Sequence, residues 1–431
     1  MLTIQAHFLT DKMPASAFTI LFVCFLATTV IARCWLAMRQ LHAVQTHRNQ
    51  VPEQFANSIS LAAHQKAGDY TTAKLRFGFF SLAVDTAILL GFTLGGGLQF
   101  ISNTLSRWLG DGMVYQIALA AAVFAISGII SIPFDYYRQF VVEERFGFNK
   151  MTPGLFFNDL VKSTLLGILI GLPLLWVLLL VMGKTGDFWW LYAWFLWCAF
   201  QFLMLFLYPT FIAPLFNKFQ PLEDETLKTK IEQLMQRTGF KAKGLFVMDG
   251  SKRSAHGNAY FTGMGSAKRV VFFDTLIKQL TAEEIEAVLG HELGHFKLRH
   301  ITKRIGVSFL ISLGFLALLG WLKTQPWFYA GLGTDAAMAT DMTALILFAL
   351  TLPVFSFFLS PILSMSSRKH EFEADAFSAQ YTDAQYLISA LVKMYQDNAA
   401  TLTPDALYSA FYDSHPPASI RIAHLTRLKN L

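Results

Sequence analysis

Charged residues are scarce in this sequence. They make up 15% of the 431 residues, whereas ordinary soluble domains carry roughly 25%. Hydrophobic residues reach 54% and aromatic residues 15%. This composition excludes an ordinary soluble domain and indicates an integral membrane protein.

Cysteine is also rare. Cys24, Cys34 and Cys198 lie in or beside apolar runs and lack the spacing of metal ligands. We therefore expect neither a disulfide framework nor a cysteine-type zinc site, and interpret all three as small packing residues. The net charge of +6 comes without any nucleic-acid motif. We expect no nucleic-acid partner and attribute the excess of Lys and Arg to the cytoplasmic bias of membrane proteins.

About seven apolar runs are long enough to cross a bilayer, which takes about 20 residues per helix. The first is long for a signal peptide and lacks a charged leading segment and a cleavage site, so we expect it to be retained. Asp85 lies inside the second run, where an acid either faces a wet cavity or makes a structural hydrogen bond or salt bridge. The predicted spans are 17–39, 78–100, 114–134, 164–183, 189–215, 305–322 and 342–364.

Basic residues gather after the first and third runs, whereas the segments on the other side are short and nearly balanced in charge. The positive-inside rule then places the N-terminus outside and the C-terminus in the cytoplasm. Both segments that look soluble would face the cytoplasm. We expect a mainly α, polytopic membrane protein divided into spans 1–5 with their loops (1–215), a first soluble segment (216–304), spans 6 and 7 (305–364) and a C-terminal soluble segment (365–431).

The first soluble segment contains HELGHFKLRH at 291–300. His291, Glu292 and His295 form the H-E-x-x-H pattern of zinc hydrolases. On a helix the two histidines share one face and bind one zinc ion, with the glutamate beside it as general base. Thr281 and Glu284 form a capping-box pattern upstream, so the motif is predicted to lie on a helix.

Two further elements are predicted before this helix. EDETLKTKIEQLMQRTGF has apolar residues at helical spacing, and Gly239 is its predicted stop. The stretch 243–277 contains β-rich pieces separated by Gly and Ser, which predicts a small meander. The apolar positions of the helix are Leu227, Ile231, Leu234 and Met235.

A catalytic zinc ion usually has three protein ligands, and the motif supplies two. In the longer pattern H-E-x-x-H-x-x-G-x-x-H, the third histidine would occupy position 301, which is isoleucine. His300 misses that register by one residue, about 100° around a helix, so we do not expect it to be a ligand.

The second soluble segment contains a polar cluster, SRKHEFEADAFSAQY at 367–381. One acid of this cluster would complete a His2Glu site, and a second would hold a ligand histidine in its tautomer. Glu371 and Asp375 share a helical face, but spacing alone does not choose between Glu371 and Glu373 as the ligand. A solvated acidic face of an amphipathic helix explains the same residues without a metal.

The stretch DSHPPASIRIAHL at 413–425 contains His415 and Arg421. A histidine and an arginine near zinc can stabilise the oxyanion that forms when water attacks an amide. Taken alone, the stretch is also typical of an ordinary loop before a helix.

In these motifs the chain resembles the type I CAAX prenyl endopeptidases, multi-pass membrane zinc metalloproteases that trim the C-termini of isoprenylated proteins. The resemblance extends over essentially the whole chain. It rests on EERFGFNK, GNAYFTG, RVVFFDTL, HELGHFK, SRKHEFEADAF and HPPASIR, which occur in this order.

The resemblance implies a chamber enclosed by the membrane helices, with a small α+β zinc metalloprotease domain on the cytoplasmic side. It implies one Zn²⁺ per chain, a peptide or protein substrate with or without a lipid modification, and contact with membrane lipid. The implied roles are His291, His295 and Glu371 as metal ligands, Glu292 as general base, Asp375 as partner of a ligand, Asn258 as substrate-backbone contact on an edge strand, and His415 and Arg421 as groups that orient the carbonyl and stabilise the intermediate.

Three other interpretations account for parts of the sequence. A protease with its motif inside a span disagrees with the charged residues that flank the motif. A shorter heat-shock type of quality-control zinc protease and a transporter or channel with a structural zinc site are the alternatives. The final residues RLKNL lack a dilysine retrieval signal, which favours a bacterial inner membrane over the endoplasmic reticulum.

Overall fold

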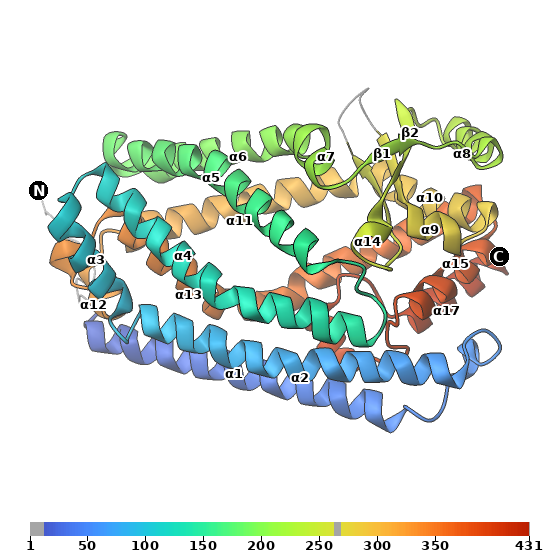
Figure 1. Ribbon diagram of the computed structural model, residues 1–431, viewed down its shortest axis with the longest axis horizontal. Helices are drawn as coiled ribbons and strands as arrows, with labels where there is room; N and C mark the ends of the chain where they lie inside the picture. Colours follow the sequence, from blue (N-terminus) through green and yellow to red (C-terminus); the bar gives the residue numbers. More distant parts are fainter. Residues whose placement is uncertain (1–12, 263–268, 431) are drawn as a thin grey trace, which may run out of the picture.

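The computed structural model describes residues 13–262 and 269–430. Long helices form an elongated bundle, and a small α+β unit lies at one end of it (Figure 1). Within the described residues, seven helices are long and apolar enough to cross a membrane, which confirms the predicted membrane fold. Their bounds are Ala15–Thr46, Leu61–Phe92, Met113–Glu143, Pro153–Lys184, Gly186–Phe216, His300–Leu322 and Asp341–Tyr381.

Most spans consist of one helix and three are composite. A π-helical turn, Arg138–Glu143, ends the third span, and another, Tyr208–Ile212, interrupts the fifth. In the last span a 3₁₀ turn, Phe357–Leu359, joins two α-helices, so the chain leaves the bundle without a loop. The helices are α1 (Ala15–Thr46), α2 (Leu61–Phe92), α4 (Met113–Tyr137), α5 (Pro153–Lys184), α6 (Trp189–Leu207), α7 (Ala213–Phe216), α11 (His300–Leu322), α13 (Asp341–Ser356) and α14 (Ser360–Tyr381).

The second predicted span, 78–100, is wrong in its bounds. Helix α2 begins at Leu61, where the hydroxyl of Ser60 accepts a hydrogen bond from the Ala63 N–H, and it ends at Phe92. Gly96 then adopts a φ of +72°, which glycine reaches without strain, and α3 (Gly97–Leu109) begins. The apolar run thus joined the end of one helix to the start of the next, because hydropathy does not register a chain reversal.

The end of the bundle remote from the α+β unit is closed by short elements packed on the helix ends. Helix α3 and helix α12 (Pro326–Ala330) lie there (Figure 1). Phe92, Leu98, Tyr115 and Phe328 belong to one buried cluster that joins these elements to the bundle. Short 3₁₀ turns occur at Glu53–Phe55, Gly186–Phe188, Gly250–Lys252 and Ala336–Met338.

The α+β unit is built on a four-stranded sheet in the order β1-β2-β4-β3. Strands β2 and β4 are parallel, and the other pairs are antiparallel, so the predicted meander is wrong. The three central residues of β4 are buried, as expected for an apolar strand inside a sheet. Strand β3 lies at the edge of the sheet, beside β4. The strands are β1 (Phe219–Pro221), β2 (Gly244–Met248), β3 (Ala259–Thr262) and β4 (Arg269–Phe273).

Helices pack on this sheet as their apolar spacing predicts. In α8 (Glu225–Arg237) all four predicted apolar positions are buried. The capping box before α10 (Ala282–Lys297) is confirmed, since Thr281 and Glu284 exchange side-chain to backbone hydrogen bonds. The remaining helices of the unit are α9 (Asp274–Gln279), α15 (Ala384–Asp397), α16 (Ala406–Tyr412) and α17 (Ala418–Lys429).

Two cavities lie between the helices on the inner side of the bundle. One, of about 620 Å³, is lined by α1, α2 and the C-terminal segment, and the other, of about 660 Å³, extends further between the spans. They share Arg33, Leu82 and Tyr412 in their walls, so they adjoin. Asp85 lines the second cavity and has no hydrogen bond or ion pair among the described residues, which favours the wet-cavity interpretation of this acid.

Candidate metal centre

Helices α10 and α14 cross at close range, and two glycines of the histidine motif permit the approach. A Cβ atom added at Gly294 would lie 3.0 Å from the Cα atom of Ala374, and one at Gly290 would lie 3.0 Å from the Ser378 hydroxyl. That hydroxyl donates a hydrogen bond to the Ala287 carbonyl at 2.7 Å. The contact brings Glu371, on the last span, beside the helix that carries the H-E-x-x-H motif.

His291, His295 and Glu371 converge at this crossing. The two Nε2 atoms lie 3.1 Å apart. Glu371 places one carboxylate oxygen 3.5 Å from His291 Nε2 and the other 3.3 Å from His295 Nε2. Ligands bound tetrahedrally at about 2.0–2.2 Å from zinc are about 3.3–3.5 Å from one another. The spacing of the three donors therefore fits a zinc ion.

The burial of Glu371 also favours a bound cation between the three donors. The side chain of Glu371 is 5% exposed, and its Oε2 atom has no hydrogen-bond partner among the described residues. Arg421 Nη1 lies 3.5 Å from this oxygen without a hydrogen bond, so a cation bound between the three donors would add to its compensation. The donor set of two imidazoles and one carboxylate is also that of catalytic zinc sites.

The outer nitrogen of His291 is held by a buried ion pair. Its Nδ1 atom lies 2.8 Å from Oδ1 of Asp375. Arg421 donates one hydrogen bond to the same Oδ1 at 2.6 Å and one to Oδ2 at 3.0 Å. Burial and the charge of Arg421 lower the pKa of His291, but the carboxylates of Asp375 and Glu371 outweigh both and raise it to about 9. When His291 is neutral and donates its Nδ1 proton to Asp375, the Nε2 lone pair faces the other two donors.

The outer nitrogen of His295 has a different partner. His295 Nδ1 lies 3.1 Å from Nδ1 of His300, and His300 Nε2 lies 2.9 Å from a carboxylate oxygen of Glu373. Glu373 thus pairs with His300, whereas Glu371 lies at the histidine pair. Spacing alone did not decide between Glu371 and Glu373. The geometry favours Glu371 as the metal ligand.

Glu292 lies near enough to His415 for its charge to act on that imidazole, and His415 is in the wall of a cavity. Glu292 is half-buried and makes no hydrogen bond or ion pair among the described residues. His415 Nε2 lies 3.4 Å from Glu371, and the imidazole lines the 620 Å³ cavity. Desolvation lowers the pKa of His415, although the charge of Glu371 opposes this. His415 can therefore reach a substrate that enters from the cavity.

Asn258 lies just before the edge strand β3 and is exposed. Its carbonyl accepts a hydrogen bond from the Phe273 N–H, and its side-chain oxygen accepts one from the Ala259 N–H. Strand β3 pairs on one side only among the described residues. Helix α10, which carries the histidine motif, contacts β3, and an open strand edge can take up an extended peptide through main-chain hydrogen bonds.

Sequence reasoning missed two cations of the cavity. Arg33 on α1 and Lys74 on α2 line the same 620 Å³ cavity as His415. Arg33 has no ion pair or hydrogen bond among the described residues. The signal was present, because an arginine inside an apolar run usually faces a polar interior.

Comparison with known proteins gives the same family along the chain. Residues 40–218 match the family described as CAAX prenyl protease N-terminal, five membrane helices, and residues 221–429 match peptidase family M48. The CAAX prenyl protease 1 homolog of Arabidopsis thaliana is 36% identical, over 92% of this chain and 95% of that protein. The CAAX prenyl protease 1 of Saccharomyces cerevisiae is 33% identical, over 91% of both chains.

A solved structure agrees with these relatives. The crystal structure of S. mikatae Ste24p superposes with a TM-score of 0.87 at 33% identity, covering 95% of this chain and 98% of that one. These matches do not favour the transporter or heat-shock alternatives. The chain belongs to peptidase family M48, and it is a multi-pass membrane metalloendopeptidase of the CAAX prenyl protease type.

Proposed function

We propose that this chain binds one Zn²⁺ through His291, His295 and Glu371 and uses it to cleave peptide bonds near the C-termini of membrane-associated proteins. The observation that carries the proposal is the 3.1–3.5 Å spacing of the three donor atoms. A bound zinc ion supplies a water of lowered pKa and a Lewis acid.

The protein groups around that water have separate tasks. Glu292 accepts a proton from the water and passes it to the leaving amine. His415 donates a hydrogen bond to the oxygen on which charge develops, an interaction whose loss typically costs about 10²–10³ in rate. Arg421 holds Asp375 against His291 and adds positive charge 3.5 Å from Glu371. A direct contact of Arg421 with the substrate oxygen stays a prediction.

The substrate class follows from the cavity and the open strand edge. An extended segment would pair with β3 near Asn258, and its C-terminal side would enter the cavity beside His415. Arg33 and Lys74 in the cavity wall are complementary to a terminal carboxylate. The names of the relatives, CAAX prenyl proteases, agree with a substrate cut near its C-terminus.

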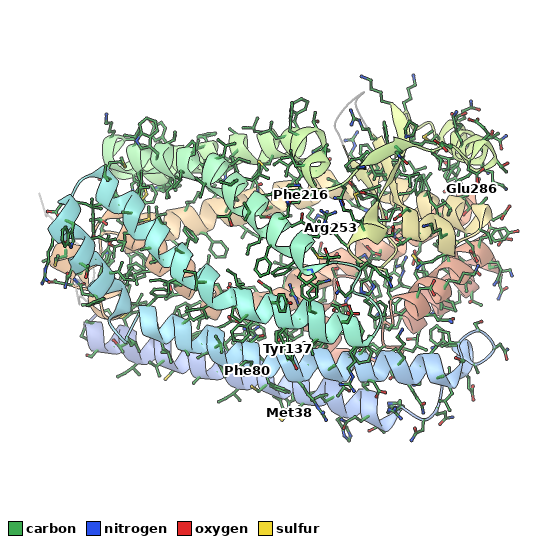
Figure 2. All side chains as sticks on the ribbon, in the orientation of Figure 1. Met38, Phe80, Tyr137, Phe216, Arg253 and Glu286 are labelled. Atoms are coloured by element: carbon green, nitrogen blue, oxygen red, sulfur yellow. The ribbon has the colours of Figure 1, made fainter. Side chains whose placement is uncertain are left out.

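A lipid modification has a suitable place between α2 and α4. A cleft of about 590 Å³ there is lined mainly by aromatic and aliphatic side chains. Phe80 and Tyr137 belong to it and lie on the facing helices (Figure 2). Phe80 stacks on Phe134 at 5.3 Å, and Phe77 stacks on Tyr137 at 5.6 Å. Such a cleft can bind an isoprenoid chain, although the residues do not require one.

The active site is proposed to face the cytoplasm. The basic segments after the first and third spans contact the α+β unit directly. Phe55 and Ile59 pack against Val392, and Asn149 forms a β-bridge with Ser254. Arg253 lies where the sheet meets the start of α5 (Figure 2) and pairs with Asp159 at 2.8 Å. The membrane itself, expected to be a bacterial inner membrane, stays a prediction that cell fractionation tests.

Replacing Glu292 by Gln tests the proposal. We expect Glu292→Gln to retain one zinc ion per chain and to cleave peptides about 10²–10⁴ times more slowly, since only the general base is removed. The substrates are matched peptides with a free or an amidated C-terminus, each with and without a farnesyl group. A wild-type rate for Glu292→Gln would overturn the assignment of the base, and equal rates on free and amidated peptides would overturn the carboxylate site.

A further inference from the structure

We propose that His300 and Glu373 are positioning residues that fix the tautomer and ring orientation of the metal ligand His295. The inference rests on the proposed zinc site and extends it. His300 lies in neither the ligand set nor the cavity, yet it is 3% exposed and touches a ligand histidine. Each nitrogen of a buried imidazole is expected to have a hydrogen-bond partner.

The protons along this chain of contacts have one consistent arrangement. If His295 binds zinc through Nε2, its single proton lies on Nδ1 and is donated to Nδ1 of His300, 3.1 Å away. His300 then carries its own proton on Nε2 and donates it to Glu373 at 2.9 Å. Every nitrogen is satisfied, both rings are neutral, and the charge of Glu373 stabilises the donor end. Such outer partners of zinc-bound histidines raise ligand basicity and restrict ring rotation.

The backbone holds His300 in this place. Helix α10 ends after Lys297, and Arg299 adopts a φ of +57°, which is unusual for a residue other than glycine. Helix α11 then begins at His300. The turn lets a residue outside the helical face of the motif approach His295 from behind, which linear helical spacing does not predict.

A second metal ion is the competing explanation of the same residues. His300, His370 and Glu373 each offer a ligand atom, all within 4.8 Å of one another. The rings of His300 and His370 stack at 4.1 Å. A metal on His300 Nε2 would move the proton of His300 to Nδ1, where it would face the proton of His295 Nδ1. Two donors would then meet at 3.1 Å, so a metal on Nε2 of His300 disagrees with zinc on Nε2 of His295.

Three variants of the full chain, purified in detergent, distinguish these explanations. His300→Phe keeps a ring against His370 and removes both hydrogen bonds. His300→Asn restores an acceptor for His295, because its Oδ1 takes the place of Nδ1. His370→Phe keeps the stacking and removes only a ligand of the second metal. The measurements are zinc content per chain, zinc affinity by chelator competition, and kcat and KM on the most rapidly cleaved peptide.

We expect one zinc ion per chain in the wild type and a 10–100-fold weaker zinc affinity in His300→Phe, by analogy with other outer partners of ligand histidines. Its kcat at saturating zinc should fall while KM stays unchanged. His300→Asn should recover most of the affinity, which repacking alone would not achieve, and His370→Phe should match the wild type. Wild-type affinity and kcat in His300→Phe would overturn the inference, as would two zinc ions of which His370→Phe loses one. A wild type that binds no zinc would instead overturn the proposed function.

Discussion

The two histidines of the proposed metal centre are supported in opposite ways. His291 contacts Asp375 and Arg421, which form an ion pair and whose side chains are 0% and 7% exposed. His295 contacts His300, and His300 contacts Glu373, whose side chain is 36% exposed to solvent. The inner support is a buried ion pair, and the outer one is an imidazole that donates to a partly exposed carboxylate. Helix α14 supplies the carboxylate on both sides.

The difference shows how burial determines the strength of a support. On the inner side, removing one charge leaves its partner unpaired in a dry site, which costs about 3–5 kcal/mol. On the outer side, water can replace the carboxylate of Glu373. The inner residues should therefore tolerate no change, whereas the outer carboxylate should tolerate an isosteric one.

The largest effect should come from Asp375→Asn compared with Glu373→Gln. Asp375→Asn keeps the size of the side chain but leaves Arg421 buried without its anion. We expect zinc affinity to fall 100-fold or more and the free energy of unfolding to fall by about 3–5 kcal/mol. Glu373→Gln still accepts a hydrogen bond from His300, so its zinc affinity should stay within about threefold of the wild type. Equal losses in the two variants would contradict the comparison.

Gly294→Ala should act on both sides at once. Alanine is the better helix former by about 1 kcal/mol, but its Cβ would lie 3.0 Å from the backbone of Ala374 and displace α14. Since Glu371 and both supports are on α14 or contact it, zinc content should fall and cleavage should be lost while the helix content stays. Gly306→Ala on α11 is the matched control, because nothing lies within 4 Å of an added Cβ there. Zinc bound normally by Gly294→Ala would show that the close approach is dispensable.

The sequence predicted what depends on local geometry. His291, Glu292 and His295 follow from helical spacing, and Thr281 with Glu284 marked the start of their helix. The choice between Glu371 and Glu373 depends on which face of α14 meets α10. That face is set by the contact at Gly290 and Gly294, between helices that α11 and α13 separate in the sequence. The position of His300 depends on a left-handed turn at Arg299. Neither the helix contact nor the turn can be predicted from the spacing of residues along the sequence.

The smallest effect should come from Glu284. This carboxylate is buried, like Asp375, but the cation that pairs with it is exposed to solvent. It is 4% exposed, accepts from Lys393 at 2.7 Å and from Ser389 at 2.6 Å, and Lys393 itself is 39% exposed. Burial alone would raise the pKa of Glu284, but Lys393 and Ser389 outweigh it and hold the pKa below the ordinary 4.5.

A carboxyl with a lowered pKa in the folded state stabilises the protein above its unfolded pKa, and the contribution is lost as the pH falls through the folded value. Glu284→Gln should therefore lower the free energy of unfolding by about 1–2 kcal/mol at pH 7, with water partly replacing the exposed Lys393. The deficit should shrink as the pH falls below 4.5. Thermal unfolding of both proteins in detergent at pH 7 and pH 4 measures it. A deficit that is the same at both pH values would show that packing, and not the charge of the carboxylate, makes this contact stabilising.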